Sequence, residues 1–317
     1  MTTPPSAITV TGLSKSYGDK VVLDGIDLEV AAGSIFSLLG PNGAGKTTTV
    51  EILTTLINAD SGEIRVAGRD VVREPDAVRG AISVTGQFSS VDNLLTGREN
   101  LIMMADLHHL GRREARRRAD ELLEQFDLAD VGSQRALAYS GGMRRRLDLA
   151  MTLVRRPAVI FLDEPTTGLD PRSRHAMWDV IRNLVSEGVT IFLTTQYLEE
   201  ADQLADLIAV LDQGRLVAQG TAAELKRRIP GSYVRLEFAE PRHLERALGA
   251  LDGARPDGTA LALQVPGDGS VGALRTLLER LDVTGVEVAE LTVHTPDLDD
   301  VFLALTTAPR RQKETVR

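Results

Sequence analysis

The stretch SIFSLLGPNGAGKTT, residues 34–48, decides the fold of this 317-residue chain. Its first half, SIFSLLG, is unbroken rather than alternating, as in strands buried on both faces of a parallel sheet. Its second half matches the pattern G-x-x-x-x-G-K-[ST], and a helical pattern follows. Glycines in such a loop let backbone N–H groups curl around a phosphate, and the helix N-terminus adds its positive dipole end. The stretch therefore predicts a strand, a phosphate-binding loop and a helix.

Two residues of this loop have specific expected tasks. Lys46 is expected to reach the β- and γ-phosphates of a nucleotide, and Thr47 to offer its hydroxyl to Mg²⁺. A glycine-rich turn without a ligand is the alternative, but the strand before the loop and the helical pattern after it favour the phosphate. The residues predicted to cradle the nucleotide are Gly40, Pro41, Asn42, Gly43, Ala44, Gly45, Lys46, Thr47 and Thr48.

A second apolar run, AVIFLDE at residues 158–164, ends in two carboxylates. Asp163 is expected to support the magnesium shell, through water. Glu164 is expected to point toward the γ-phosphate and to orient or deprotonate the attacking water, which is typically worth about 10²–10⁴-fold in rate. A strand-end acidic pair that only caps the next turn is the alternative, and the phosphate loop upstream argues against it.

The rest of the chain divides into segments of different character. Apolar runs alternate with helical patterns from residue 8 to about residue 225, which predicts an α/β fold with a mostly parallel sheet. Residues 88–156 are helix-rich and form a predicted helical subdomain inserted in that fold. Period-two and helical patterns at 231–307 predict a small C-terminal α+β domain. Residues 1–7 and 308–317 are predicted to be disordered tails.

Arginines are frequent in the predicted helical subdomain. In the segment 113–126 one helix face is apolar, and the arginines lie elsewhere on the helix. Arg144–Arg146 and the arginines of 112–118 are therefore interpreted as solvated helix faces. The apolar face consists of Ala115, Ala119, Leu122, Leu123 and Phe126.

Composition limits the partners that the chain can have. The net charge of −9 argues against nucleic acid as the main partner, because binding phosphates requires a basic face. The chain has no cysteine, which excludes disulfides and thiolate metal sites. No apolar run approaches the roughly 18 residues that span a bilayer, and the N-terminus lacks a signal-peptide pattern. We therefore expect a cytoplasmic protein that reaches a membrane through a partner chain.

Further motifs join the first two in a fixed order. SVTGQF (83–88) places a glutamine after a short strand, and YSGGMRRRLDLA (139–150) places Ser-Gly-Gly at a helix start. With the GLD turn and the strand before TTQYLEEADQLAD (194–206), this order resembles the ATP-binding-cassette ATPases, with a P-loop NTPase fold. The wording of these segments and of DLDDVFLALT (297–306) is similar to the daunorubicin/doxorubicin-resistance type of bacterial antibiotic-efflux ATPase.

The resemblance implies the remaining site residues. Tyr17 would stack on the adenine ring, and Gln87 would touch Mg²⁺ and the lytic water. The signature reads YSGGM rather than LSGGQ, which puts only the polar contacts beyond its glycines in doubt. The residues expected to meet the ATP of a second subunit, across a dimer seam, are Ser140, Gly141, Gly142 and Asp170.

At the switch position, which contacts the γ-phosphate, Gln196 stands where the family more often has a histidine. A glutamine amide can donate to a phosphate oxygen and accept from water, but it does not titrate near neutral pH. Gln196 is therefore expected to sense and position, with Glu164 as the base. The acidic run after it, Glu199, Glu200 and Asp202, is typical of a helix N-terminus.

The function implied is that of the ATP-hydrolysing subunit of an exporter, peripheral on the cytoplasmic face of the membrane. Two copies would close around two ATP molecules and drive a separate membrane permease subunit. One alternative is a soluble cassette ATPase acting on nucleic acid or ribosomes, against which the single phosphate loop and the lack of sustained heptads argue. Another is a drug-sequestering binding module, against which Glu164 argues. The C-terminal domain is compatible with a regulatory role, a dimer brace or a specificity element.

Overall fold

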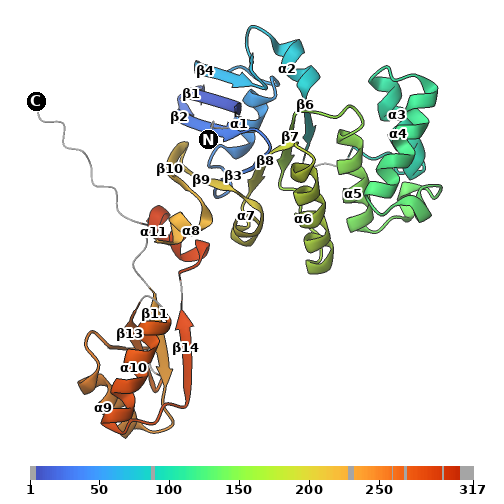
Figure 1. Ribbon diagram of the computed structural model, residues 1–317. Helices are drawn as coiled ribbons and strands as arrows, with labels where there is room; N and C mark the ends of the chain where they lie inside the picture. The colour runs from blue at the N-terminus through green and yellow to red at the C-terminus, as the bar shows by residue number, and fades with distance from the viewer. Residues whose placement is uncertain are drawn as a thin grey trace, which may run out of the picture. The chain divides into compact units, whose positions relative to one another are not determined.

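The structure, a computed structural model, describes residues 5–86, 90–227, 232–258, 260–267, 270–294 and 296–307. The chain divides into two compact units, Met1–Ala222 and Ala223–Arg317. Figure 1 shows the chain coloured from the N-terminus to the C-terminus. Each unit has its own sheet or sheets and its own hydrophobic core.

A six-stranded sheet of order β10-β9-β3-β8-β7-β6 forms the centre of the first unit. All neighbours are parallel except β9 and β10, which confirms the predicted mostly parallel sheet. Strands β3, β7 and β8 are buried at every position, which explains their unbroken apolar patterns. The strands are β3 Ile35–Leu39, β6 Ile82–Thr85, β7 Val159–Asp163, β8 Thr190–Thr195, β9 Leu207–Asp212 and β10 Arg215–Gly220.

A four-stranded antiparallel sheet of order β2-β1-β4-β5, drawn in blue in Figure 1, was not predicted. Register shifts interrupt the β1–β2 pairing at several points, and such bulges break the period-two pattern that reveals strands. Strand β1 begins at Ser6, inside the tail expected for residues 1–7, because Ser6 pairs with Ala31. The strands are β1 Ser6–Tyr17, β2 Lys20–Ala31, β4 Ser61–Val66 and β5 Arg69–Asp70.

Helices α3, α4 and α5 gather beyond β6, at one end of the first unit (Figure 1). They share one hydrophobic cluster, to which each contributes buried side chains such as Leu101, Leu122 and Leu147. The apolar face predicted on 113–126 is buried throughout. The helices of this unit are α1 Lys46–Leu53, α2 Pro75–Ala81, α3 Gly97–Leu107, α4 Arg112–Gln125, α5 Gly141–Thr152, α6 Pro171–Ser186 and α7 Leu198–Leu204, with α8 Ala222–Arg227 following at the unit boundary.

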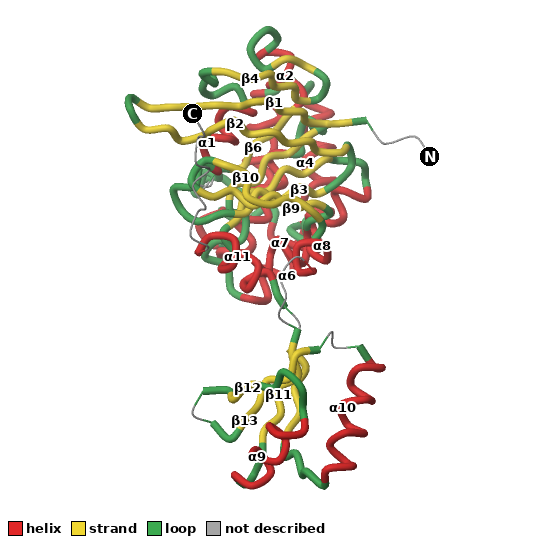
Figure 2. The backbone as a smooth tube through the Cα atoms, turned by 90° about the vertical axis from the view of Figure 1, so that its left-hand side faces the viewer, coloured by secondary structure: helices red, strands yellow, loops and turns green. Residues whose placement is uncertain are grey.

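The second unit contains a four-stranded antiparallel sheet of order β12-β13-β11-β14, whose strands are yellow in Figure 2, near helix α10. Its elements follow the β-α-β-β-α-β order. Val234, Leu236 and Leu263 of the sheet pack against α9 and α10 in one cluster. Leu261 precedes β13 and is 39% exposed. The elements are β11 Tyr233–Glu237, α9 Pro241–Ala250, β12 Arg255–Pro256, β13 Ala262–Pro266, α10 Val271–Thr284, β14 Glu290–His294 and α11 Leu298–Thr307.

Candidate functional site

The predicted site segments meet at one edge of the six-stranded sheet. Because β3, β8, β7 and β6 are adjacent and parallel, their carboxyl ends lie at the same edge, where α/β proteins bind ligands. The register places Leu39 beside Thr195, and Thr194 beside Asp163. The phosphate loop, the switch residue and the acidic pair therefore follow three neighbouring strands.

The phosphate loop connects β3 to α1 through a backbone that requires glycine. Gly45 has a φ of 112°, and a Cβ added there would lie 2.6 Å from Cδ2 of Leu23 and 3.0 Å from the carbonyl oxygen of Val22. A side chain at this position is therefore excluded both by conformation and by space. The result is a helix that starts directly at Lys46, with its first N–H groups available for an anion.

Lys46 is buried and turned back onto its own loop. Its Nζ donates to the carbonyl oxygens of Gly40 at 2.7 Å and of Pro41 at 3.1 Å. Burial lowers the pKa of Lys46, whereas the carboxylates of Glu164 and Asp163 act to raise it. The ammonium group of Lys46 is therefore close enough to the two carboxylates to interact with them electrostatically.

The acidic pair stands at the end of β7. Asp163 is buried, and its Oδ1 accepts a hydrogen bond from the hydroxyl of Thr194. The backbone N–H of Glu164 donates to the carbonyl oxygen of Thr194 at 3.0 Å. Glu164 itself has a φ of 48°, in the left-handed region that few non-glycine residues adopt. The chain thus turns sharply at the residue predicted to be the base.

Gln196 lies directly against this residue. Its Nε2 donates to Oε2 of Glu164 at 3.3 Å, and the hydroxyl of Thr167 donates to the same oxygen at 3.2 Å. Two neutral donors therefore converge on one carboxylate oxygen and orient it. The structure brings the predicted switch, after β8, into contact with the predicted base, after the neighbouring strand β7.

The signature residues gather in a different place, at the starts of α5 and α6. Ser140 caps α5 by accepting from the N–H of Met143 at 3.2 Å, and Asp170 caps α6 by accepting from the N–H of Ser173 at 2.9 Å. A Cβ added to Gly142 would lie 2.7 Å from the Ser173 hydroxyl, so only glycine allows this approach. A cavity of about 370 Å³ opens here, lined by Ser140, Gly142, Met143, Arg146, Asp170, Arg172, Ser173 and Ala176.

The signature cavity and the phosphate loop are not brought together within the chain. In Figure 1, β6 and β7 lie between α1, which follows the loop, and α5, which begins at the signature. Gly141 follows Ser140 at this N-terminus. The hydrogen bonds from Ser173, of its hydroxyl first and then of its N–H, lower the pKa of Asp170. The start of the signature helix thus lies apart from the loop of its own chain.

Tyr17 belongs to neither group of contacts and lies in the antiparallel sheet. Tyr17 ends β1, where it pairs with Lys20 in the hairpin to β2, and it is 51% exposed. The Nζ of Lys15 lies 5.5 Å from its ring centroid. Gln87 lies outside the described residues, after the end of β6. An exposed ring of this kind is free to stack on a planar group.

Sequence reasoning missed two buried acids, Asp148 and Glu200. Glu200 was assigned to an acidic helix start, but its side chain is buried, and Oε1 accepts from the hydroxyl of Thr166 at 2.8 Å and from Nε1 of Trp178 at 3.3 Å. Burial raises the pKa of Glu200, against the hydrogen bonds that lower it. It therefore joins the segment after the acidic pair to the helix after the switch. In the sequence, Thr166 close to the acidic pair was the available indication of a hydrogen-bond partner for a buried acid.

The interpretation of the arginines as solvated helix faces is confirmed for Arg112, Arg113, Arg116 and Arg117, which are exposed, but it is wrong for Arg118 and Arg145. The side chain of Arg145 is 14% exposed and that of Arg118 is 13% exposed. Each pairs with a carboxylate and donates to backbone carbonyls. The reason is that the long apolar stems can lie buried while the guanidinium finds acceptors inside.

Comparison with known proteins agrees with this geometry. A sequence model described as "ABC transporter" matches residues 23–167. The chain is 52% identical to the daunorubicin resistance ATP-binding protein DrrA3 of Streptomyces coeruleorubidus, over 98% of each chain. It is 48% identical to the daunorubicin/doxorubicin resistance ATP-binding protein DrrA of Streptomyces peucetius, over 99% of this chain and 96% of that protein.

The fold also matches solved structures. An ATP-binding subunit of an ABC transporter aligns with a TM-score of 0.62 and 29% identity, over 70% of this chain and 92% of that one. Among the residues that the structure describes, no helix combines the length and apolar character needed to cross a bilayer. The chain therefore belongs to the ABC transporter family, as an ATP-binding, ATP-hydrolysing subunit of the daunorubicin/doxorubicin-resistance group.

Proposed function

We propose that this subunit uses ATP hydrolysis to drive export of a drug or antibiotic through a separate membrane permease subunit, on the cytoplasmic face of the membrane. The observation that carries the proposal is the meeting of the phosphate loop, the acidic pair and the switch at the ends of adjacent parallel strands. The names of its relatives suggest the cargo class. Within the chain, residues 8–225 would form the ATP-binding domain and residues 231–307 the accessory C-terminal domain.

ATP would bind with its phosphates on the loop from Gly40 to Thr48 and its adenine on Tyr17. Lys46 now donates to two carbonyl oxygens of the loop, and phosphate oxygens would take their place. This exchange of neutral acceptors for charged ones strengthens each hydrogen bond. The loop therefore keeps its shape before ATP arrives, and its lysine is already placed.

The oxygen-bearing side chains predicted to hold the metal fit Mg²⁺. Asp163 offers a buried carboxylate, Thr47 an exposed hydroxyl and Gln87 an amide oxygen, and hard oxygen ligands of this kind are those that Mg²⁺ prefers. Bound magnesium would neutralise charge on the phosphates. The Thr194 hydroxyl holds Asp163 in place for that task.

Glu164 would accept the proton of the attacking water, and Gln196 would fix the direction of its carboxylate. The hydrogen bond between them leaves the second carboxylate oxygen of Glu164 for water. Because the amide of Gln196 does not titrate near neutral pH, the pH dependence of hydrolysis would come from other groups.

Two copies of the chain would complete two sites. Ser140, Gly142 and Asp170 line a cavity apart from the loop of their own chain, and Gly141 follows Ser140 there. These residues would therefore contact the γ-phosphate bound by a second copy. Sedimentation of the full chain with and without ATP tests this, with Glu164→Gln used to prevent hydrolysis. A monomer at saturating ATP would contradict the homodimer.

Export itself is tested with the permease. We expect the chain to co-purify with a membrane subunit, and the ATP turnover of that complex to rise when a transported compound is added. ATP turnover by a chain that associates with no membrane protein would leave the ATPase intact and remove the export proposal. Binding to nucleic acid that weakens steeply with salt would instead support the soluble alternative.

A further inference from the structure

Arg145 and Asp148 form a shielded ion pair within helix α5. The Nη1–Oδ2 distance is 3.1 Å, and the two side chains are 14% and 4% exposed. A pair removed from water is costly unless further hydrogen bonds satisfy it. The remaining partners of the two side chains therefore show what the pair is for.

Arg145 reaches out of its own helix to the strand ends of the site. Its Nε donates to the carbonyl oxygen of Pro165 at 2.8 Å, and its Nη2 to that of Asp163 at 3.4 Å. These two residues flank Glu164, which turns through a left-handed backbone. The planar guanidinium thus donates hydrogen bonds to the residues before and after Glu164, because its rigid group of N–H donors can reach both carbonyl oxygens at once.

The same pair also contacts the chain on either side of Gln87. The Nη1 of Arg145 donates to the carbonyl oxygen of Gly86 at 3.2 Å, and Oδ1 of Asp148 accepts from the N–H of Ser90 at 2.9 Å. Gly86 follows β6, which lies beside β7 in the sheet. One ion pair on α5 therefore links two separate strand ends.

We propose that Arg145 is a positioning residue for ATP hydrolysis, which holds Glu164 in its working orientation and ties it to the signature helix. Helix α5 starts at Ser140, little more than one turn before Arg145. A shift of this helix when ATP meets its N-terminus would therefore pull on the turn of Glu164 through a single side chain. The inference rests on the proposed role of Glu164 as the base.

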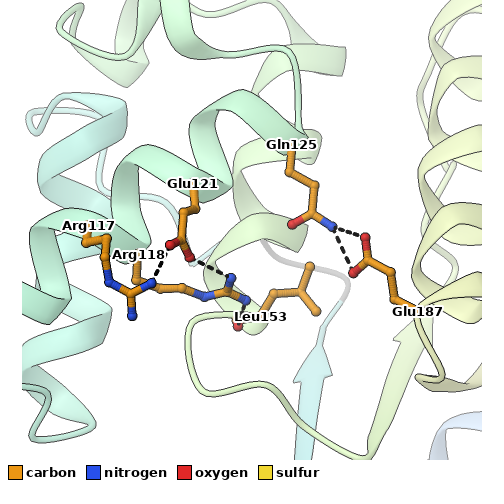
Figure 3. A network of polar contacts seen from close by, with 6 residues as sticks. All are labelled: Arg117, Arg118, Glu121, Gln125, Leu153 and Glu187. Atoms are coloured by element: carbon orange, nitrogen blue, oxygen red, sulfur yellow. Dashed lines mark hydrogen bonds and ion pairs between the residues drawn. The ribbon is translucent and has the colours of Figure 1, made fainter.

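The other end of α5 supplies a matched control. Arg118 of α4 is 13% exposed, pairs with Glu121 at 3.4 Å and donates to the carbonyl oxygen of Leu153 at 2.8 Å, as Figure 3 shows. Leu153 is the residue that ends α5. Arg118 thus has the same burial and the same kind of partners as Arg145, but it holds the end of α5 away from the signature.

The experiment compares Arg145→Lys with Arg118→Lys in the full chain. Lysine keeps the charge but cannot bridge three carbonyl oxygens at once. We expect kcat for ATP to fall about tenfold or more in Arg145→Lys only, because small misplacements of catalytic groups have effects of this size. KM, the Kd for a fluorescent ATP analogue and the number of analogue sites should stay within about twofold of wild type in both variants.

Equal kcat values in the two lysine variants would overturn the proposal. So would a loss of kcat in Arg145→Lys that is matched by an equal loss of analogue-binding sites, because that result describes misfolding. Glu164→Gln is measured in parallel. If Glu164→Gln retains ATP turnover, Glu164 is not the base. If Glu164→Gln loses turnover while Arg145→Lys keeps a normal kcat, only the positioning role of Arg145 is rejected.

Asp148→Asn decides the case if Arg145→Lys does not fold. Asparagine keeps an acceptor for Ser90 but removes the negative charge that holds Arg145. We expect an intermediate fall in kcat at unchanged KM and an unchanged number of analogue-binding sites. Where Arg145→Lys does fold, combining the two changes should cause no further fall than Arg145→Lys alone, since both act through one contact. Unchanged kcat in Asp148→Asn, or independent effects that multiply, would contradict the inference.

Discussion

The two units of the molecule place their charges differently. In the first unit Lys46, Asp163 and Glu200 are buried beside strand ends, each held by named hydrogen bonds. In the second unit Arg235 lies on the sheet face opposite the hydrophobic cluster, 31% exposed, with Glu237 and Asp257 as partners. The buried groups of the first unit are held by neutral partners, whereas Arg235 is held by two carboxylates, and only the first set is shielded from water.

The difference separates charge that serves chemistry from charge that serves solubility. Ionised groups out of water are costly, so a fold that keeps several of them at one sheet edge has a use for them there. Exposed pairs are screened by solvent and contribute little. We therefore expect substitutions of the shielded residues at the strand ends of the first unit to change turnover strongly, and charge substitutions in the second unit to change it little.

Glu164→Gln should give the largest effect. Removing the proposed base should lower kcat by about 10²-fold or more, because general-base help is worth that much. ATP binding should persist, since Lys46 and the loop are unchanged. Glu199→Gln, at an exposed glutamate that pairs with Arg174, is the control and should keep normal turnover. Equal turnover in the two variants would remove Glu164 from the site.

Gln196→Ala should have the next largest effect. The carboxylate of Glu164 would lose one of two donors, and we expect kcat to fall about tenfold with KM nearly unchanged. Gln196→His sharpens the test: its imidazole titrates near pH 6.5, so turnover should acquire a step close to that pH that wild type lacks. If ATP turnover had the same pH profile in Gln196→His as in wild type, the result would contradict a contact between residue 196 and the site.

Glu200→Gln should change stability in a pH-dependent way. Burial raises the pKa of Glu200 above its ordinary value of 4.5. The folded chain therefore binds this proton more tightly than the unfolded chain, so this contribution to stability is complete below the ordinary pKa and is lost as pH rises.

Glutamine cannot ionise, so the variant should melt close to wild type at pH 5. At pH 8 its melting temperature should exceed that of wild type, by about 2–4 °C for each kcal/mol of ionisation cost removed. Thermal melts from pH 5 to pH 8 measure this, with Glu199→Gln as the exposed control. A difference that does not vary with pH would argue that Glu200 is not the titrating group.

Arg235→Ala should have the smallest effect. The guanidinium lies on the sheet of the second unit, where its partners are Asp257 and Glu237. We expect ATP turnover to stay within about twofold of wild type, as for surface substitutions in general. A fall as large as that of Gln196→Ala would break the distinction between the two units and assign the second one a part in hydrolysis.

The central sheet and the phosphate loop were predictable because their signals are local. Strands buried on both faces give unbroken apolar runs, and the loop needs glycine for steric reasons that the sequence displays directly, as at Gly45. The antiparallel sheet was not predictable, since its register shifts remove the alternation that marks strands.

The site was predictable residue by residue where a motif supplied it, but its supports were not. Arg144, Arg145 and Arg146 point about 100° apart on a helix, and nothing in three adjacent arginines says which one faces the sheet. Leu248 and Leu278 show the same limit in the second unit: both fit helical patterns, and both are at least 40% exposed at the margin of the apolar stripe.

At Glu164, the residue that best suits the left-handed backbone differs from the residue proposed for catalysis. A φ of 48° costs a glutamate about 1 kcal/mol or more, and glycine would adopt it freely. Selection of random variants for heat resistance alone should therefore enrich Glu164→Gly, with asparagine as the next choice. With Glu164 as the proposed base, selection for turnover retains glutamate despite this cost, and a glycine at this position predicts a cassette that no longer hydrolyses ATP.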